Sequence, residues 1–582
     1  LDRTFPLQVQ APTPRQTVLK RYTVNPGETL EVKEADLAGF LKQTVNATLS
    51  VSDKAPIDVK SAVQGLLTYP YGCAEQTTST AYPHVFIDEA AAKQFGLKAY
   101  TQAQRAEMLD KAIGRLAGMQ APNGGFSLWG NVNEYQYWLS AYITNFLLDA
   151  REQGFTVPAE MEKKAVDFLL TGLQQGVAGL PRGPLNYNEN SVWNDWRYAG
   201  SGRFGVLAYG AYVLARQGKA PLATLRTLSE ASEQAHSGLG LVHLGLALKL
   251  MGDEARSKTA IDAGLKKPRF NNYWWGDYGT NLRDWAQMYV LLQKHELTPE
   301  GRENLVGMVA GEIEKNRYIS TQEKLSLFLL GRSFANQQTG DWTAEVAGLA
   351  GPQDSAPAAS TPSSRRTPGS SSSTNITTKG THFISLPATD LTTGVKLKNT
   401  HKERLFVELN YAGNPAKAPA ARRDAFDIKR EWYTADGKAL GADANARALK
   451  VGETLIVRLN VKTKGRYANG LVVDYVPAGV EIENANIVQG EQSSVEIAKV
   501  DMRQAMQDTR IKHVEFRDDR FVVAARLEGE MNFFYRVRVV TPGKFVMPPT
   551  YAEDMYQPMV YGLAGGGEAV SIGDGKDDGA KR

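Results

Sequence analysis

The sequence predicts a multidomain protein in which a helical α/α toroid is inserted in a β domain and followed by a β-sandwich. Three observations predict this order. Apolar residues alternate near the start of the chain, recur at helical spacing from about residue 56 to 350, and alternate again after about 381. The chain has 582 residues, which is enough for about three to four domains.

Residues 1–55 are predicted to be β structure. Arg21–Thr23 and Glu28–Lys33 flank the turn Asn25-Pro26-Gly27, and Thr44–Ser52 alternates between apolar and polar residues. This stretch is too short to form a domain alone. We therefore expect it to pair with the β material just after residue 381.

Residues 56–350 are predicted to be helical, with Gly- and Pro-containing loops between the helices. The helices pair at irregular spacing and are rich in Ala, Gly and Leu on one face, which predicts a toroid of about six helical hairpins. The predicted helices are Arg105–Met119, Trp138–Arg151, Ala159–Leu173, Phe204–Arg216, Leu239–Leu250, Leu282–His295, Arg302–Lys315 and Lys324–Phe334.

Residues 351–412 are predicted to hold a flexible Ser- and Pro-rich segment, 352–380, and then the returning part of the first β domain. Residues 413–582 are predicted to form a β-sandwich, with one helix around Glu496–Asp508. Strands are expected at Arg404–Asn410, Glu453–Lys462, His513–Arg517, Arg520–Arg526 and Asn532–Val540.

Composition excludes several classes of protein. The 67 basic and 63 acidic residues leave a net charge of +4 without a long basic run, so we expect no nucleic-acid partner. No window of about 20 apolar residues occurs, so no membrane-spanning helix is expected. The chain begins at Leu1 without a signal-like segment, so we expect a processed or truncated piece. We expect no cofactor.

The single cysteine, Cys73, is followed three residues later by Gln76. Side chains at this spacing are neighbours on the first turn of a helix, so the sulfur can reach the glutamine carbonyl and form a thioester with loss of ammonia. Gly72 is expected to allow a tight turn at the helix entrance. Because water hydrolyses an activated acyl group, the bond needs cover, and Tyr69 and Tyr71 are candidates.

Three other interpretations of these residues remain open. Cys73 can be a buried structural thiol with Gln76 at a helix cap, or the nucleophile of a cysteine protease with His84 as its base. The aromatic segment 273–278 can instead line a carbohydrate site, with Asp277 and Glu134 as its carboxylates. Packing at the toroid rim is the plainer explanation of that segment.

The string YGCAEQ at 71–76 resembles the thioester motif of the alpha-2-macroglobulin and complement family. Four further strings, at 138–150, 427–438, 472–484 and 553–558, resemble helical and C-terminal segments of the same family. The resemblance implies a CUB-like domain at 1–55 and 351–412, a thioester domain at 56–350, and a receptor-binding-like macroglobulin domain at 413–582.

The resemblance also implies roles for individual residues. Cys73 and Gln76 are the expected thioester pair, with Glu75 as a structural third member. A lock between Tyr69 and Met555 is expected to shield the bond, with Met559 as the fallback. Some relatives use a histidine to redirect attack to hydroxyls, but the stretch Asn186–Asp195, where it would lie, has none. We therefore expect direct aminolysis.

The function implied by the resemblance is a broad-spectrum endopeptidase inhibitor and not an enzyme. Target proteases would be captured through lysine amines after cleavage of an upstream bait region. The resemblance also implies a monomer in the periplasm, anchored to the inner membrane by an upstream lipid, with a peptidoglycan synthase as a further partner. Two alternatives stay open: a binding or scaffold module without a thioester, and a glycan-acting α/α-toroid enzyme.

Overall fold

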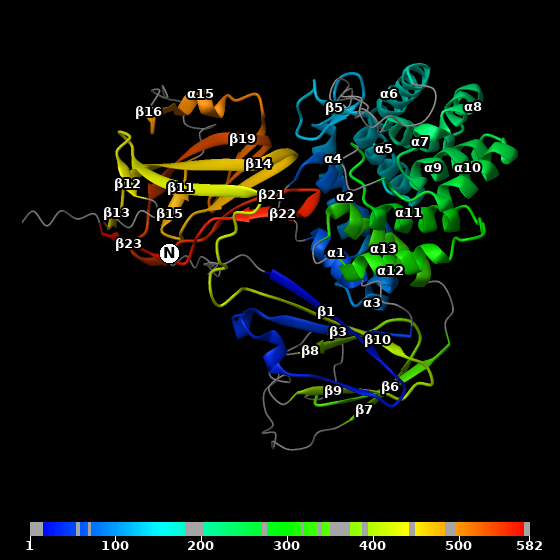
Figure 1. The fold of residues 1–582 in the computed structure, drawn as a ribbon, viewed down its shortest axis with the longest axis horizontal. Coiled ribbons are helices and arrows are strands. Elements are labelled where there is room, and N and C mark those ends of the chain that lie inside the picture. Colours follow the sequence, from blue (N-terminus) through cyan, green and yellow to red (C-terminus); the bar gives the residue numbers. More distant parts are fainter. Residues whose placement is uncertain are drawn as a thin grey trace, which may run out of the picture.

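The computed structural model shows three units: a small β unit, a helical toroid and a β-sandwich (Figure 1). The residues that the structure describes are 16–53, 59–67, 72–180, 203–270, 276–315, 319–335, 340–349, 373–386, 394–441, 448–483 and 496–574. Among these residues, no helix is long and apolar enough to cross a membrane.

The small β unit contains two four-stranded sheets, ordered β1-β10-β3-β8 and β2-β9-β6-β7. Its strands come from both sides of the helical region, since β3 pairs antiparallel with both β8 and β10. Side chains such as Leu49, Trp342 and Leu405 fill the space between the sheets and are fully buried. The strands are β1 (Gln16–Val24), β2 (Thr29–Val32), β3 (Asn46–Ser52), β6 (Trp342–Ala347), β7 (Thr374–Thr378), β8 (His382–Leu386), β9 (Val395–Asn399) and β10 (Leu405–Gly413).

Two strands of this unit differ from the sequence-based prediction. β6 lies inside the range assigned to the helical domain, 56–350, yet pairs with β7 and β9. β7 lies inside the segment 352–380, which was predicted to be a flexible loop, so that prediction was wrong for Thr374–Thr378. Its β-branched threonines and Ile376 suit an edge strand. Its low apolar content gave no periodic pattern from which a strand could be predicted. Residues 350–372 lie outside the described residues.

The toroid is built from an inner and an outer ring of helices. The inner helices α2, α5, α7, α9, α11 and α13 contact one another in that order, and α13 contacts α2 to close the ring. Each predicted helix is present, with ends shifted by a few residues. The helices are α1 (Val59–Leu67), α2 (Ala74–Phe86), α3 (Glu89–Gln94), α4 (Gln102–Ala117), α5 (Tyr137–Glu152), α6 (Ala159–Ala178), α7 (Arg203–Ala215), α8 (Leu222–Glu230), α9 (Gly238–Leu250), α10 (Glu254–Lys266), α11 (Asn281–Lys294), α12 (Asn304–Lys315) and α13 (Thr321–Ala335).

Amino-acid composition explains how the inner and outer helices pack so closely. Helix α9 is apolar on every side, and its residues 238–248 are all buried, as expected for a helix surrounded by protein. A Cβ added at Gly238 would lie 2.1 Å from the carbonyl oxygen of Gly264 in α10. Glycine is therefore required there for the backbones of the two rings to touch.

The β-sandwich is dominated by two long, paired strands, β14 and β19. Its main sheet contains the path β12-β11-β14-β19-β15 together with β18, β21 and β22, and a smaller sheet has the order β13-β23-β20. The strands are β11 (Phe426–Thr434), β12 (Ala439–Gly441), β13 (Leu449–Lys450), β14 (Thr454–Tyr475), β15 (Val480–Ile482), β18 (Ile511–Phe516), β19 (Arg520–Val539), β20 (Gly543–Val546), β21 (Thr550–Asp554), β22 (Gln557–Leu563) and β23 (Ala569–Gly573).

Two predictions in the sandwich needed correction. The strands expected at Arg520–Arg526 and Asn532–Val540 are one continuous strand, β19. The helix expected around Glu496–Asp508 begins instead as a hairpin of β16 (Glu496–Ile497) and β17 (Val500–Asp501), and only the short α15 (Met502–Met506) is helical. Ala498 and Lys499 both have positive φ, as the turn of a two-residue hairpin requires.

The sandwich packs directly on the toroid. Leu471, Val473, Val522, Ala524, Met555 and Tyr556 belong to the same buried apolar cluster as the toroid core. Their neighbours Val472 and Val523 face the sandwich core instead. Strands buried on both faces have near-continuous apolar sequences, as β14 and β19 do here. In Figure 1, β21 and β22 lie at the boundary between sandwich and toroid, beside α2.

Candidate functional site

Cys73 and Gln76 lie at the first turn of α2. Cys73 is the N-cap residue, with φ −64° and ψ 165°, and its carbonyl accepts the Thr77 N–H at 2.8 Å. Gln76 is the third residue of the helix, so the two side chains occupy the facing positions of a capping box, with sulfur in place of the usual hydroxyl. Both are shielded from solvent, at 0% and 1% exposure.

The Gln76 amide has poor hydrogen-bond partners for a buried polar group. Its Nε2 donates to the Met555 sulfur at 3.4 Å, and a thioether is a weak acceptor. Its Oε1 is buried and accepts no hydrogen bond from the described residues. A buried amide left in this state costs about 1–3 kcal/mol relative to a satisfied one.

Glu75 is a fully buried carboxylate that joins three parts of the structure. It accepts hydrogen bonds from Ser79 Oγ at 2.6 Å, Thr321 Oγ1 at 2.9 Å and Gln322 Nε2 at 2.6 Å, which link α2 to the start of α13. It also accepts one from Tyr556 Oη at 2.8 Å, which links both helices to the sandwich. Burial raises the pKa of Glu75, and the four donors offset that effect only in part.

The sandwich covers the site with the two-residue turn between β21 and β22, Met555 and Tyr556. Asn469 O accepts the Met555 N–H at 3.1 Å, and Asp554 Oδ1 accepts the Tyr556 N–H at 3.0 Å. The Tyr556 ring packs edge-on against Tyr278, with centroids 4.4 Å apart. Its hydroxyl lies 3.8 Å from the Cys73 sulfur.

The electrostatic surroundings disfavour a thiolate at Cys73. Burial, and then the negative charge of Glu75, raise the pKa of the thiol to about 12. Backbone N–H groups of Gln76 and Glu75 at the helix start oppose this rise and do not cancel it. A free thiol here would stay protonated at neutral pH.

Gly72 contributes in a different way from that expected. Its φ is outside the left-handed region, so a tight turn does not require glycine here. Instead, Arg115 Nε donates to the Gly72 carbonyl at 3.0 Å, and an added Cβ would lie 2.4 Å from Arg115 Nη2. The absent side chain leaves room for the guanidinium against the backbone.

The structure brings some predicted residues together and leaves others apart. Met555 lies against Gln76, whereas the fallback, Met559, is 50% exposed. Tyr69, Tyr71 and the stretch Asn186–Asp195 lie outside the described residues. Sequence reasoning missed Tyr556, Thr321 and Gln322; Tyr556 adjoins Met555 in the quoted string at 553–558, but no local pattern marks the other two.

The protease interpretation is not supported by the position of His84. Its ring packs edge-on against Tyr100 at 5.6 Å, and burial lowers its pKa to about 4. No described hydrogen bond links it to Cys73. A base for that thiol would need such contact.

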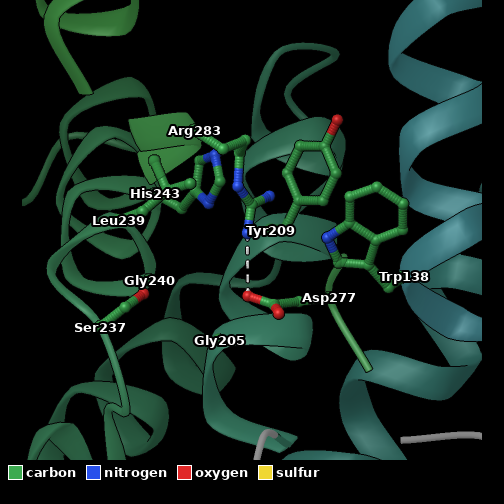
Figure 2. Close-up of a pocket in the computed structure, with 9 residues that line it drawn as sticks. All are labelled: Trp138, Gly205, Tyr209, Ser237, Leu239, Gly240, His243, Asp277 and Arg283. Carbon is green, nitrogen blue, oxygen red and sulfur yellow. Dashed lines mark hydrogen bonds and ion pairs between the residues drawn. The ribbon is translucent and has the colours of Figure 1, made fainter. Parts of the chain in front are cut away.

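Asp277 is held in a buried ion-pair cluster in the toroid, and Figure 2 shows its pair with Arg283. It pairs with Arg269, with Arg283 Nη2 at 3.0 Å and with His236 Nε2 at 3.1 Å. The adjacent cavity has a volume of about 10 Å³, room for about one water molecule. Glu134 is exposed, so this pair does not form the carboxylate site that glycan hydrolysis needs.

Two stretches of the chain, and nearly its whole length, resemble known proteins. Residues 42–194 match the family described as the A-macroglobulin TED domain, and residues 426–558 match the bacterial alpha-2-macroglobulin MG10 domain. The chain is 34% identical over 565 residues to alpha-2-macroglobulin of Escherichia coli K12, covering 96% of this chain and 32% of that protein. The chain thus spans about a third of the length of such relatives.

Solved structures agree with this similarity over nearly the whole chain. Native Escherichia coli alpha-2-macroglobulin, spanning domain MG7 to the C-terminus, superposes with a TM-score of 0.83 at 33% identity, covering 97% of this chain and 83% of that one. Salmonella alpha-2-macroglobulin reacted with methylamine gives a TM-score of 0.82 at 32% identity, covering 96% of this chain and 34% of that one.

Proposed function

The chain belongs to the bacterial alpha-2-macroglobulin family, and we propose that it traps proteases covalently through a thioester between Cys73 and Gln76. The thioester forms when the cysteine sulfur replaces the side-chain nitrogen of the glutamine and ammonia leaves. The protein is an inhibitor and not an enzyme, because each molecule spends its acyl group once.

One observation carries this proposal: the site leaves the hydrogen-bonding groups of the Gln76 amide poorly satisfied. Among the described residues, the amide nitrogen has only a thioether sulfur as acceptor and the oxygen accepts no hydrogen bond. A thioester has no N–H donors and a less polar carbonyl, so its formation removes most of this cost. The reacting groups stand at the N-cap and third positions of α2, within the same first turn of the helix, and such closeness favours the reaction.

The closed site protects the bond in two ways. Cys73 and Gln76 are at most 1% exposed, so water does not reach the acyl carbon. A buried thiol with a pKa near 12 is also a poor leaving group. Opening the site returns this pKa toward its ordinary value of about 8.5, which speeds departure of the sulfur.

The trapping step is a simple acyl transfer. A lysine amine of the protease attacks the Gln76 carbonyl carbon, and the bond between that carbon and the Cys73 sulfur breaks. The proton lost by the amine ends on the sulfur. The products are an amide between protease and inhibitor and a free thiol.

The domain assignment that we propose follows the strand pairing. A CUB-like domain comprises β1–β3 and β6–β10 and has the toroid, α1–α13, inserted in it as the thioester domain. The β-sandwich from β11 onward is the macroglobulin domain that carries the shielding turn. We propose that the whole protein acts in the periplasm, where cleavage of a bait segment releases this shield.

Methylamine tests the proposal without any protease. Intact chain is denatured and titrated for thiol before and after incubation with methylamine. We expect no thiol before treatment and one afterwards, with methylamine bonded at Gln76. The Salmonella relative solved after reaction with methylamine supports this expectation. One titratable thiol in the untreated chain, with Gln76 still an amide, would instead indicate a scaffold module without a thioester.

A further inference from the structure

Glu75 is not used by the trapping reaction, although it is the most heavily hydrogen-bonded group at the site. Within the described residues it forms no ion pair, and four side-chain donors hold it. Its negative charge also opposes ionisation of Cys73. A buried carboxylate without a cation is costly, so its presence beside the sulfur calls for a chemical explanation.

Tyr556 connects this carboxylate to the sulfur. The Tyr556 hydroxyl lies 3.8 Å from Cys73 Sγ and donates to Glu75 Oε2 at 2.8 Å. A phenol hydroxyl can accept one hydrogen bond and donate another at the same time. The three groups therefore form a continuous path from the thiol to the carboxylate, and all three are buried.

Making the thioester requires such a path. The thiol has to lose its proton to attack, yet its pKa of about 12 in the closed site keeps it protonated. The amide nitrogen has to gain a proton to leave as ammonia. Since Cys73 and Gln76 are closed to solvent, water cannot serve as the carrier, and a side chain has to accept the proton and return it.

We propose that Tyr556 and Glu75 form a proton relay that builds the thioester, so that the bond forms only after the sandwich has docked on the toroid. This inference rests on the proposed function. The thiol proton passes to Tyr556 Oη while the tyrosine proton passes to Glu75 Oε2, and the sulfur attacks Gln76 Cδ. The carbon–nitrogen bond then breaks, and ammonia leaves with the proton that Glu75 held. Glutamine amide and thiol become thioester and ammonia, with no net redox change.

This arrangement makes thioester formation follow the docking of the last domain. Tyr556 follows Cys73 by 483 positions, so the relay is incomplete until the last domain has folded. The residue that completes the relay adjoins Met555, which covers Gln76. The bond is therefore made at the moment when its shield is in place, and water does not meet it beforehand.

The test compares two tyrosine variants with the same chemical change. Tyr556→Phe removes the relay hydroxyl and keeps the ring. Tyr278→Phe is the control: the Tyr278 ring packs against Tyr556, but its hydroxyl donates to Gln136 and takes no part in the relay. Peptide mass after digestion reports whether Gln76 is still an amide, or has become a thioester, a glutamate or a methylamide. We expect conversion about 100-fold slower in Tyr556→Phe and normal in Tyr278→Phe.

Further measurements separate the outcomes. Glu75→Gln should also leave Gln76 as an amide, while Met555→Ala should convert Gln76 to a thioester that water then hydrolyses to glutamate faster than in the unaltered chain. For unaltered chain obtained unfolded, with Gln76 still an amide, conversion during its first folding should be slower in D2O, a readout that does not depend on how the variants fold. Equal conversion in Tyr556→Phe, or equal rates in D2O and water, would overturn the relay and leave the proposed function intact. An unconverted Gln76 in the unaltered chain would overturn both.

Discussion

Met555→Ala tests how the sandwich shields the acyl group. The Met555 side chain is 5% exposed and its sulfur lies 3.4 Å from Gln76 Nε2. Truncating a buried methionine to alanine costs about 2–5 kcal/mol. We take the lower value of about 2 kcal/mol because Met555 lies at a domain boundary. At this cost, the open state of the site becomes roughly 30-fold more populated.

The assay follows appearance of the Cys73 thiol during incubation with methylamine. If opening limits the reaction, the variant should react about 30-fold faster than the unaltered chain. Met559→Ala is the matched control, because it makes the same chemical change at a residue that is 50% exposed; we expect its rate to change by about twofold at most. Equal rates for the two alanine variants would refute the idea that Met555 covers the bond.

Two further predictions come from the structure and a third comes from the sequence. Burial raises the pKa of Asp554 from 3.8 to about 6, so the folded state binds more protons than the unfolded state between these values; stability of the last domain should fall by about 3 kcal/mol as pH rises through that window. Thermal unfolding measured at about pH 4 and about pH 7 should show this loss of stability, and Asp554→Asn should abolish the difference. Arg430 pairs with Asp474 at 2.7 Å, with both side chains buried, so Arg430→Met should destabilise the sandwich by about 3–5 kcal/mol in urea unfolding. Because Thr550, at the start of β21, also bonds Asp474, this variant should release the thiol faster as well. Methylamine should label Gln76 faster than glycerol does, and faster labelling by glycerol would contradict direct aminolysis.

The parts of the fold that the sequence predicted are those with strong local periodicity. The helices around Trp138–Arg151 and Leu239–Leu250 were found within two residues because their apolar spacing is fully local. β7 and the hairpin at 496–501 were missed because each depends on a partner or on a turn rather than on apolar pattern. Long β19 was divided for the same reason, since the strand is recognised as continuous only by its pairing with β14 on both sides of Gly529.

The residues of the site likewise divide into those that local sequence identifies and those that depend on distant contacts. Cys73, Glu75 and Gln76 are adjacent in sequence, so a motif suffices to identify them. Thr321 and Gln322 come from the start of α13, and Tyr556 comes from the last domain. Their contacts with Glu75 arise from closure of the helical ring and from docking of the sandwich, and neither event leaves a signal in the neighbouring residues.

The mass of the peptide that carries Cys73 and Gln76, taken from freshly purified chain under conditions that preserve acyl bonds, tests the central claim most directly. The account predicts a mass lower by one ammonia than the sequence requires, and an alkylating reagent that fails to label the cysteine. A peptide of full mass with an alkylated cysteine would contradict it.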